Sequence, residues 1–411
     1  MKRIFQLLLF VPLIGIAQDK GIRFQHGLNW KETREKAKAE NKYIFIDCYA
    51  TWCGPCKTMS QKVFPLEQVG TYMNDKFISI KVQFDTTGND NDTVKGWYAD
   101  AHQFMQEYKI GLFPTYLFFA PDGHIVHKAA GAFPNPKTFL DKVADALDPD
   151  KQFYTLLKQY DEGKRDTTMV RRLALSAFEF NDQDMAARFG REYIQGMKNV
   201  YTKDHLQFIT RFTTTSHDKG FDLFLHHADK VDRIMGPDHA EMSVMNIIAR
   251  EDKIISSLEQ PGASAPDWDA IYAGIKKKYA DSYADRTVTW TKVWYYQKNQ
   301  QWANYTKSLI PYIEKYGNNT PPFYLNNYAW DVFRYSTDST ELIAALSWSR
   351  RTMDKEKDNA ANMDTYANLL YKLGRKEEAI TREVIAAQLS PDDKSFQETL
   401  YKMRKDEKTW N

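Results

Sequence analysis

The first third of the chain alternates short apolar runs with amphipathic segments. The run YIFIDCY (43–49) is almost entirely apolar or aromatic, which is typical of a strand buried on both faces. The segment FISIKVQF (77–84) alternates along its length and predicts a second strand. A third apolar run, TYLFFA (115–120), is followed by a Pro-Asp-Gly turn (121–123) and by HIVHKA (124–129), which together predict a hairpin.

Helical signals separate these runs. Asn29 can cap a helix that extends to about Glu40, and a second helical segment is interrupted near Pro65. A further helix is expected through Tyr108, and Asn135 followed by proline begins another. The predicted order β-α-β-α-β-β-α implies an α/β fold, in which a mixed sheet is covered by helices on both faces.

The pattern changes after residue 148. From about residue 151 onward there is almost no strand pattern, and amphipathic helices with aromatic faces are separated by short loops. The clearest breaks are the Pro- and Gly-containing stretches 261–266 and 317–322. We therefore expect an all-α domain over 149–411, after an α/β domain over 18–148.

The end of this helical part is repetitive. The segments NNYAWDVF and MDTYANLLYKLG place Tyr-Ala pairs at 328 and 366. A glycine, two small residues and a proline follow the second pair at the tetratricopeptide-repeat positions, namely Gly374, Ala379, Ala386 and Pro391. The region from about 323 to 403 thus resembles degenerate tetratricopeptide repeats. The 38-residue offset departs from the usual 34, and Thr352 stands where a repeat would have alanine.

The N-terminus has the pattern of a targeting segment. Lys2 and Arg3 precede an apolar run over 4–16 that is shorter than the roughly 20 residues of a membrane span. Small residues end this run, so we expect a signal peptide over 1–17 that is cleaved after Ala17, with an uncleaved anchor as the alternative. A cleaved signal predicts a periplasmic or secreted protein.

Composition excludes some functions. The 411 residues include 56 basic and 54 acidic side chains, so no basic excess points to nucleic acid, and we expect no nucleic-acid partner. All three cysteines, Cys48, Cys53 and Cys56, lie within 13 residues. This clustering raises the question of whether they bind a metal, crosslink the fold or react.

Metal binding explains the cysteines poorly. An iron–sulfur cluster needs a fourth thiolate, which the chain does not contain, and a zinc site would need a histidine from elsewhere in the sequence. Cys48 also lies inside a predicted buried strand, whereas the other two cysteines follow its end. We therefore expect neither a metal nor another cofactor. A structural disulfide between Cys53 and Cys56 would close a loop so short that it stabilises by only about 2 kcal/mol.

Thiol–disulfide exchange fits the Cys53–Cys56 pair better. The reaction needs an accessible thiolate and a second thiol that resolves the mixed disulfide. Cys53 is expected at a helix N-terminus, where free N–H groups stabilise a thiolate, and Cys56 one turn later and less exposed. The remaining interpretation, a buried thiol that does not react, fits Cys48 but not Cys53 or Cys56.

The segment FIDCYATWCGPCK resembles the active-site segment of the thioredoxin superfamily. The resemblance covers about residues 25–148, and the flanking sequences are most similar to the thioredoxin-like periplasmic domain of the disulfide reductase DsbD and its secreted relatives. A second segment, GLFPTYLFF, matches the family's Gly-x-x-Pro-Thr strand. The resemblance implies that the Phe113–Pro114 bond is cis and lies beside the cysteines, where the backbone of Phe113 pairs with an extended substrate.

The resemblance also assigns roles around the cysteines. Asp47 falls on the family's buried acid, which would take the proton of Cys56, because burial raises the proton affinity of a carboxyl group. The alternative is that Asp47 is solvated or paired with Lys57. Trp52 is expected to shape the substrate surface together with Gly54 and Pro55, although an ordinary packing role fits Trp52 nearly as well. The loop that begins at residue 85 is longer than in plain thioredoxin and is expected to be a flexible surface loop.

These features predict a thiol–disulfide oxidoreductase that mainly reduces disulfides in client proteins. Its electrons would come from a membrane thiol donor, and the helical domain would bind clients or partners. The Gly-Pro dipeptide favours this direction, because thioredoxin, which shares it, has a potential near −270 mV, against about −120 mV for DsbA. Two alternatives stay open. One is an oxidase or isomerase using the same pair, and the other is a repeat scaffold with a redox-sensing thioredoxin module.

Overall fold

The computed structural model describes residues 20–252, 254–258 and 266–410. The expected signal peptide and the expected break at 261–266 lie wholly or mainly outside these residues. The chain divides into two compact units, 1–198 and 199–411. Among the described residues, no helix is both long enough and apolar enough to cross a membrane.

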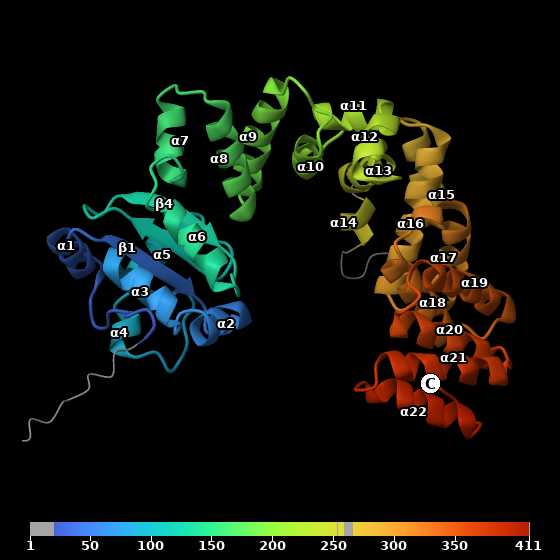
Figure 1. Cartoon of the computed structure of the whole chain (residues 1–411). Coiled ribbons are helices and arrows are strands. Elements are labelled where there is room, and N and C mark those ends of the chain that lie inside the picture. Colours follow the sequence, from blue (N-terminus) through green and yellow to red (C-terminus); the bar gives the residue numbers. More distant parts are fainter. Residues whose placement is uncertain (1–19, 253, 259–265, 411) are drawn as a thin grey trace, which may run out of the picture. The chain divides into compact units, whose positions relative to one another are not determined.

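A four-stranded mixed sheet forms the centre of the first unit (Figure 1). Strand β1 (Tyr43–Tyr49) pairs in parallel with β2 (Phe77–Gln83) and antiparallel with β3 (Thr115–Phe119). Strand β4 (Ile125–Ala130) completes the order β2-β1-β3-β4 through the hairpin predicted from the sequence. β1 is therefore central, which explains its nearly unbroken apolar sequence.

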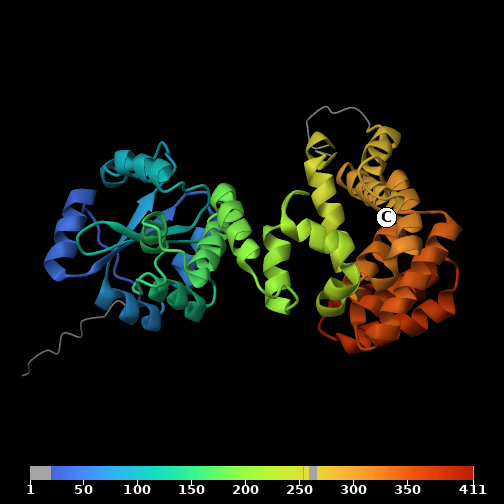
Figure 2. The ribbon, with the colours of Figure 1, turned by 90° about the horizontal axis from the view of Figure 1, so that it is seen from above.

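Helices cover both faces of this sheet, as predicted, and Figure 2 shows them on either side of the strands. One face packs against α1 (Trp30–Glu40) and α5 (Tyr98–Glu107). The other packs against α2 (Gly54–Lys62), α3 (Glu67–Lys76) and α6 (Pro136–Asp145). A short helix, α4 (Asp92–Lys95), lies in the loop after β2.

Capping residues set the helix starts that the sequence predicted. Asn29 accepts a hydrogen bond from the backbone N–H of Glu32, and the Glu32 side chain accepts one from the Asn29 N–H, which completes a capping box. Asn135 caps α6 in a similar way, with Pro136 in its first turn. The predicted interruption near Pro65 separates α2 from α3.

Three further helices belong to the first unit, namely α7 (Phe153–Asp161), α8 (Thr167–Glu179) and α9 (Gln183–Gly196). The unit boundary therefore falls after residue 198, whereas the sequence pattern changes at 148. The helices α7 and α8 pack on β4, which is otherwise an exposed sheet edge, and α9 packs on α8. The backbone N–H of Phe153 donates to Nδ1 of the buried His127 at 3.0 Å, and Phe153 packs edge-on against Phe180.

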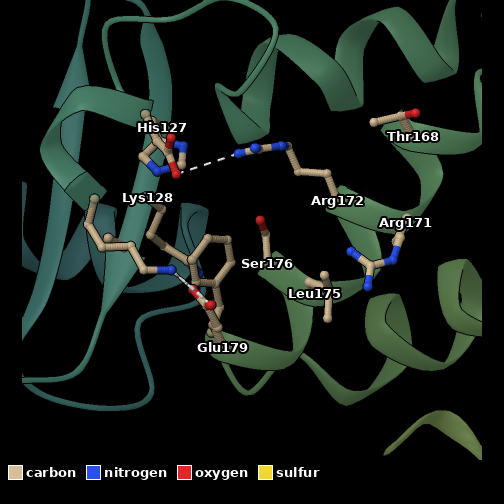
Figure 3. Close-up of a pocket in the computed structure, with 12 residues that line it drawn as sticks. His127, Lys128, Thr168, Arg171, Arg172, Leu175, Ser176 and Glu179 are labelled. Carbon is tan, nitrogen blue, oxygen red and sulfur yellow. Dashed lines mark hydrogen bonds and ion pairs between the residues drawn. The ribbon is translucent and has the colours of Figure 1, made fainter. Parts of the chain in front are cut away.

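Ion pairs reinforce this attachment across a cavity of about 300 Å³ (Figure 3). Lys142 of α6 lies 2.7 Å from Glu179 of α8, and Arg172 of α8 lies 3.5 Å from Asp145 of α6. The side chain of the buried Lys128 lies over the ring of Phe180 and donates to a backbone carbonyl in the first unit. The sheet edge and the first helices of the C-terminal part therefore form one packed body.

The described residues of the second unit contain helices joined by short loops and no strand. Its helices are α10 (Lys203–Phe212), α11 (Lys219–His226), α12 (Ala228–Met235), α13 (His239–Glu251), α14 (Ile254–Leu258), α15 (Trp268–Lys276), α16 (Asp281–Lys298), α17 (Trp302–Tyr316), α18 (Pro322–Tyr335), α19 (Ser339–Lys355), α20 (Ala360–Lys372), α21 (Lys376–Leu389) and α22 (Lys394–Arg404). Consecutive helices pack in pairs, including α18 with α19 and α20 with α21.

The repeat-like residues lie where close helix packing needs them. Ala379 and Ala386 of α21 are completely buried, and Gly374 ends α20 with a left-handed backbone (φ 81°) that glycine adopts without strain. Thr352 is also completely buried, and its hydroxyl donates to the Ser349 carbonyl at 2.7 Å. Local hydrogen bonding therefore lets threonine occupy a position where a repeat would have alanine.

Candidate active site

Cys53 and Cys56 are joined by a disulfide bond at the start of α2, with their Cα atoms 5.3 Å apart. Cys53 is the N-cap residue of this helix, and its Sγ accepts a hydrogen bond from the backbone N–H of Cys56 at 3.1 Å. In the reduced form the same N–H and the helix dipole would act on the Cys53 sulfur, and both favour its thiolate. This is the position that the sequence predicted.

The exposure of the two cysteine residues differs from the expectation. Cys53 is 2% exposed and Cys56 is 5% exposed, so the first cysteine is not the more accessible one in the disulfide form. Both pack in a small apolar cluster with Ala50, Tyr49 and Phe113, which covers the start of the helix. The sequence placed Cys53 at a helix end but gave no information about this cover.

The Phe113–Pro114 bond is cis, as the resemblance implies, and precedes β3. Phe113 contacts the cysteine cluster, and its ring lies 6.0 Å from that of Trp52 in an edge-on arrangement. Trp52 is 71% exposed, and Gly54 and Pro55 are exposed beside it. An incoming protein would therefore meet the exposed face of Trp52 next to the disulfide.

Asp47 is buried on the side of the sheet that faces α2. It is 1% exposed, so the solvated alternative is wrong, and burial raises its pKa to about 6. Its Oδ2 atom pairs with Nζ of Lys81 at 3.2 Å, while Oδ1 has no hydrogen-bond partner among the described residues. The exposed Lys57, the alternative partner, makes no such contact.

Lys81 also locates Asp47 relative to the cysteines. Its Nζ donates to Oγ of Ser60 at 2.6 Å, and Ser60 is four residues after Cys56 on the same face of α2. Lys81 therefore connects Asp47 to α2 at the residue one turn after Cys56. Cys48 belongs to the opposite face, where it is completely buried among Ile44, Ile46 and other apolar side chains.

Sequence reasoning missed Lys81 and Asp85. In the parallel register of β1 and β2, Asp47 stands opposite Lys81. Lys81 is the charged residue in the otherwise largely apolar segment 77–84, and this could have indicated it as the partner of Asp47. Asp85 accepts hydrogen bonds from both the backbone N–H and the hydroxyl of Thr51, the residue before Trp52. It ties the active-site turn to the end of β2.

The long loop after β2 is organised by the carboxylate of Asp90, which accepts hydrogen bonds from Thr87, Gln83 and Tyr98. These bonds lower the pKa of Asp90 well below its usual range, with the Thr87 hydroxyl first among them. They also raise the pKa of Tyr98 to about 12. The carboxylate thus has a structural role in this loop.

Comparison with known proteins agrees with this geometry. A family model for a thioredoxin-like domain matches residues 30–147. Thioredoxin AMT13 of Alternaria alternata is 30% identical over 115 residues, which are 28% of this chain and 80% of that protein. The N-terminal part of this chain therefore belongs to the thioredoxin family.

Two further similarities are narrower. Thiol:disulfide interchange protein DsbD of Pseudomonas fluorescens is 29% identical over 90 residues, which are 22% of this chain and 13% of that protein. The TPR domain of P58(IPK) covers 61% of this chain and 67% of that chain at 12% identity, with a TM-score of 0.24. The helix pairs of the second unit are defined by the packing of its own consecutive helices.

Proposed function

We propose that this protein reduces disulfide bonds in client proteins outside the cytoplasm, using Cys53 as the nucleophile and Cys56 as the resolving thiol. The observation that carries the proposal is the position of the pair at the start of α2, where the Cys56 N–H points at the Cys53 sulfur. The buried Asp47, which Lys81 connects to the same helix, supplies a base. The predicted signal peptide supports the extracytoplasmic location.

The reaction proceeds in two exchanges. The Cys53 thiolate bonds to one sulfur of the client disulfide, whose S–S bond breaks and whose second sulfur leaves as a thiolate. Cys56 then bonds to the Cys53 sulfur and displaces the client, which departs as a dithiol with two electrons. Asp47 accepts the Cys56 proton in this second exchange, because its pKa of about 6 leaves it ionised but basic near neutral pH.

The surroundings of the pair favour an extended client. Trp52 and Phe113 form the wall next to the disulfide, and Phe113 lies in the segment that leads into β3. A client strand lying along Phe113 would present its disulfide to Cys53. The resulting Cys53–Cys56 disulfide must be reduced again, and a membrane thiol donor is the class of reductant that fits this location.

Insulin reduction tests the activity. The full chain with dithiothreitol should accelerate precipitation of the insulin B chain, and Cys53→Ser should abolish that acceleration. Cys48→Ser is the matched control, because Cys48 is a cysteine of the same segment on the opposite face of the sheet. Equal rates for parent and Cys53→Ser would contradict the proposal.

A redox titration tests the direction. A reductase is expected to equilibrate near the thioredoxin value of about −270 mV, whereas a value near the −120 mV of DsbA would assign the pair to oxidation. Cys56→Ala should trap mixed disulfides with clients, because the second exchange is removed. Recovery of non-covalent partners alone would favour the scaffold alternative.

A further inference from the structure

The second unit contains a cleft of about 410 Å³ whose walls are mainly aromatic. This volume lies within the usual range for ligand sites, roughly 300–1,000 Å³. The ring-bearing residues come from three consecutive helices, α16, α17 and α18, and the opposite wall comes from the α12–α13 turn. The aromatic residues that line it are Trp290, Tyr312, Tyr316, Tyr324 and Tyr328.

Three of the rings lie against one another, and the lining reaches solvent at Tyr324. Trp290 and Tyr312 have ring centroids 5.1 Å apart, and Tyr312 and Tyr316 have centroids 5.6 Å apart. Tyr324 at the rim is 54% exposed, and the neighbouring Phe323, which does not line the cleft, is 67% exposed. Clustered exposed aromatic side chains of this kind mark binding surfaces.

The floor of the cleft carries more negative than positive charge. The buried Arg286 pairs with Glu241 and lies 3.6 Å from Oδ2 of Asp238. Its guanidinium also lies over the ring of Tyr316, 4.8 Å from the ring centre. Two carboxylates thus face one guanidinium, and this group has a net charge of −1.

The polar atoms that lack a partner within the described part of the chain include an acceptor, Oδ1 of Asp238, and a buried donor, Nε of Arg286. Oδ2 of Asp238 is used by Arg286 and by the side-chain amide of Asn319, but Oδ1 has no hydrogen bond or ion pair among the described residues. The hydroxyls of Tyr324 and Tyr328 make no hydrogen bond there either. Because the floor is negatively charged, a ligand that fits this cleft carries a positive charge, hydrogen-bond donors and a flat face, together with a carbonyl oxygen that can accept from Nε of Arg286.

We propose that this cleft binds an arginine side chain in an extended segment of a client or partner protein. The proposal rests on the proposed function of the helical region as a platform for such proteins. A guanidinium stacks on aromatic rings and pairs with carboxylates, and Arg286 already lies over the Tyr316 ring and pairs with two carboxylates at the floor. The arginine side chain of the client or partner would lie between the aromatic rings and Oδ1 of Asp238.

Calorimetric titration of the full chain with two peptides tests this. The peptide acetyl-Gly-Gly-Arg-Gly-Gly-amide should bind saturably and about tenfold more tightly than its citrulline counterpart, which has the same shape without the charge. Equal affinities would overturn the proposal, because an uncharged side chain would then satisfy the cleft. Failure of the arginine peptide to bind at 5 mM (roughly the range of a −3 kcal/mol interaction) would overturn it as well.

Substitutions locate the site. Tyr324→Ser should weaken binding of the arginine peptide about fivefold or more, whereas Phe323→Ser, at an equally exposed neighbour outside the cleft, should leave it unchanged. Asp238→Asn should remove the preference over citrulline. Equal effects of the two aromatic substitutions would contradict the site.

The Cys53→Ser variant should bind the peptide normally, so loss of this site and loss of disulfide reduction are separate outcomes.

Discussion

Nζ of Lys81 lies 3.2 Å from Oδ2 of Asp47, and the two residues stand opposite each other on neighbouring parallel strands. Burial raises the pKa of Asp47, and the positive charge of Lys81 opposes that rise, so the pair sets the value at about 6. Because the same amine also bonds Ser60 on α2, this ion pair connects the sheet to the cysteine helix.

Lys81→Met should raise the pKa of Asp47 further, because the charge that stabilises its carboxylate is removed. The acidic limb of the pH–rate profile for insulin reduction should then move upward by about one pH unit. Lys57→Met is the matched control, since Lys57 is an exposed lysine on the same helix that does not contact Asp47. Identical profiles for the two variants would contradict the role given to Lys81.

Asp47→Asn should change how stability depends on pH. The folded-state pKa of Asp47, about 6, lies above its ordinary 3.8, so the folded parent binds a proton more tightly and loses stability as pH rises from about 4 to above 6. The variant lacks this loss and should gain about 3 kcal/mol relative to the parent between pH 4 and pH 8. Urea unfolding at both pH values measures the free energy of unfolding of parent and variant. A difference between them that is the same at pH 4 and pH 8 would contradict this prediction.

Trp52→Ala should slow reduction of protein disulfides about twofold to tenfold, because an exposed aromatic contact beside the disulfide is lost. A small disulfide such as oxidised glutathione should react at the parental rate, since it does not need that surface. Tyr401→Ala removes an exposed aromatic side chain from α22 in the other unit and serves as the control. Parallel loss on both substrates would indicate a packing role for Trp52.

His127→Asn should protect the first unit against acid. The Nδ1 atom of the buried His127 accepts the Phe153 N–H, and burial lowers the His127 pKa to about 3. The parent therefore loses stability as pH falls below the ordinary value of 6.5, by about 1.4 kcal/mol per pH unit. Asparagine offers a similar acceptor without the charge, and thermal unfolding at pH 4 and pH 7 should show a smaller loss. An unchanged acid sensitivity would exclude His127 as its source.

Glu383→Gln should stabilise the second unit at alkaline pH. The Glu383 side chain is completely buried beside Asp364, and burial and this neighbouring carboxyl group raise its pKa well above its usual range. The folded state thus favours the protonated acid, and stability falls as pH rises above the ordinary value of about 4.5. Melting of parent and variant should coincide near pH 4 and diverge steadily up to pH 9, with the variant the higher. Coincident curves at both pH values would refute this.

Much of the first unit was predictable because its signals are local. The capping residues Asn29 and Asn135 begin helices where the sequence placed them, and the run 43–49 forms the central strand. Cys53 and Cys56 were identified from their spacing before a helix. The partner of Asp47 was not, because Lys81 is 34 positions away in the sequence and becomes a neighbour only through strand pairing.

The sequence by itself determined the α/β pattern, the all-helical remainder and the choice of Cys53 and Cys56 over Cys48, since periodicity and spacing are properties of neighbouring residues. Tertiary structure alone decided which lysine pairs with Asp47 and how the cysteine sulfurs are covered. It also decided that α7–α9 join the sheet edge and that aromatic residues of three helices meet at Asp238. These features depend on contacts between distant segments, which only the folded packing brings together.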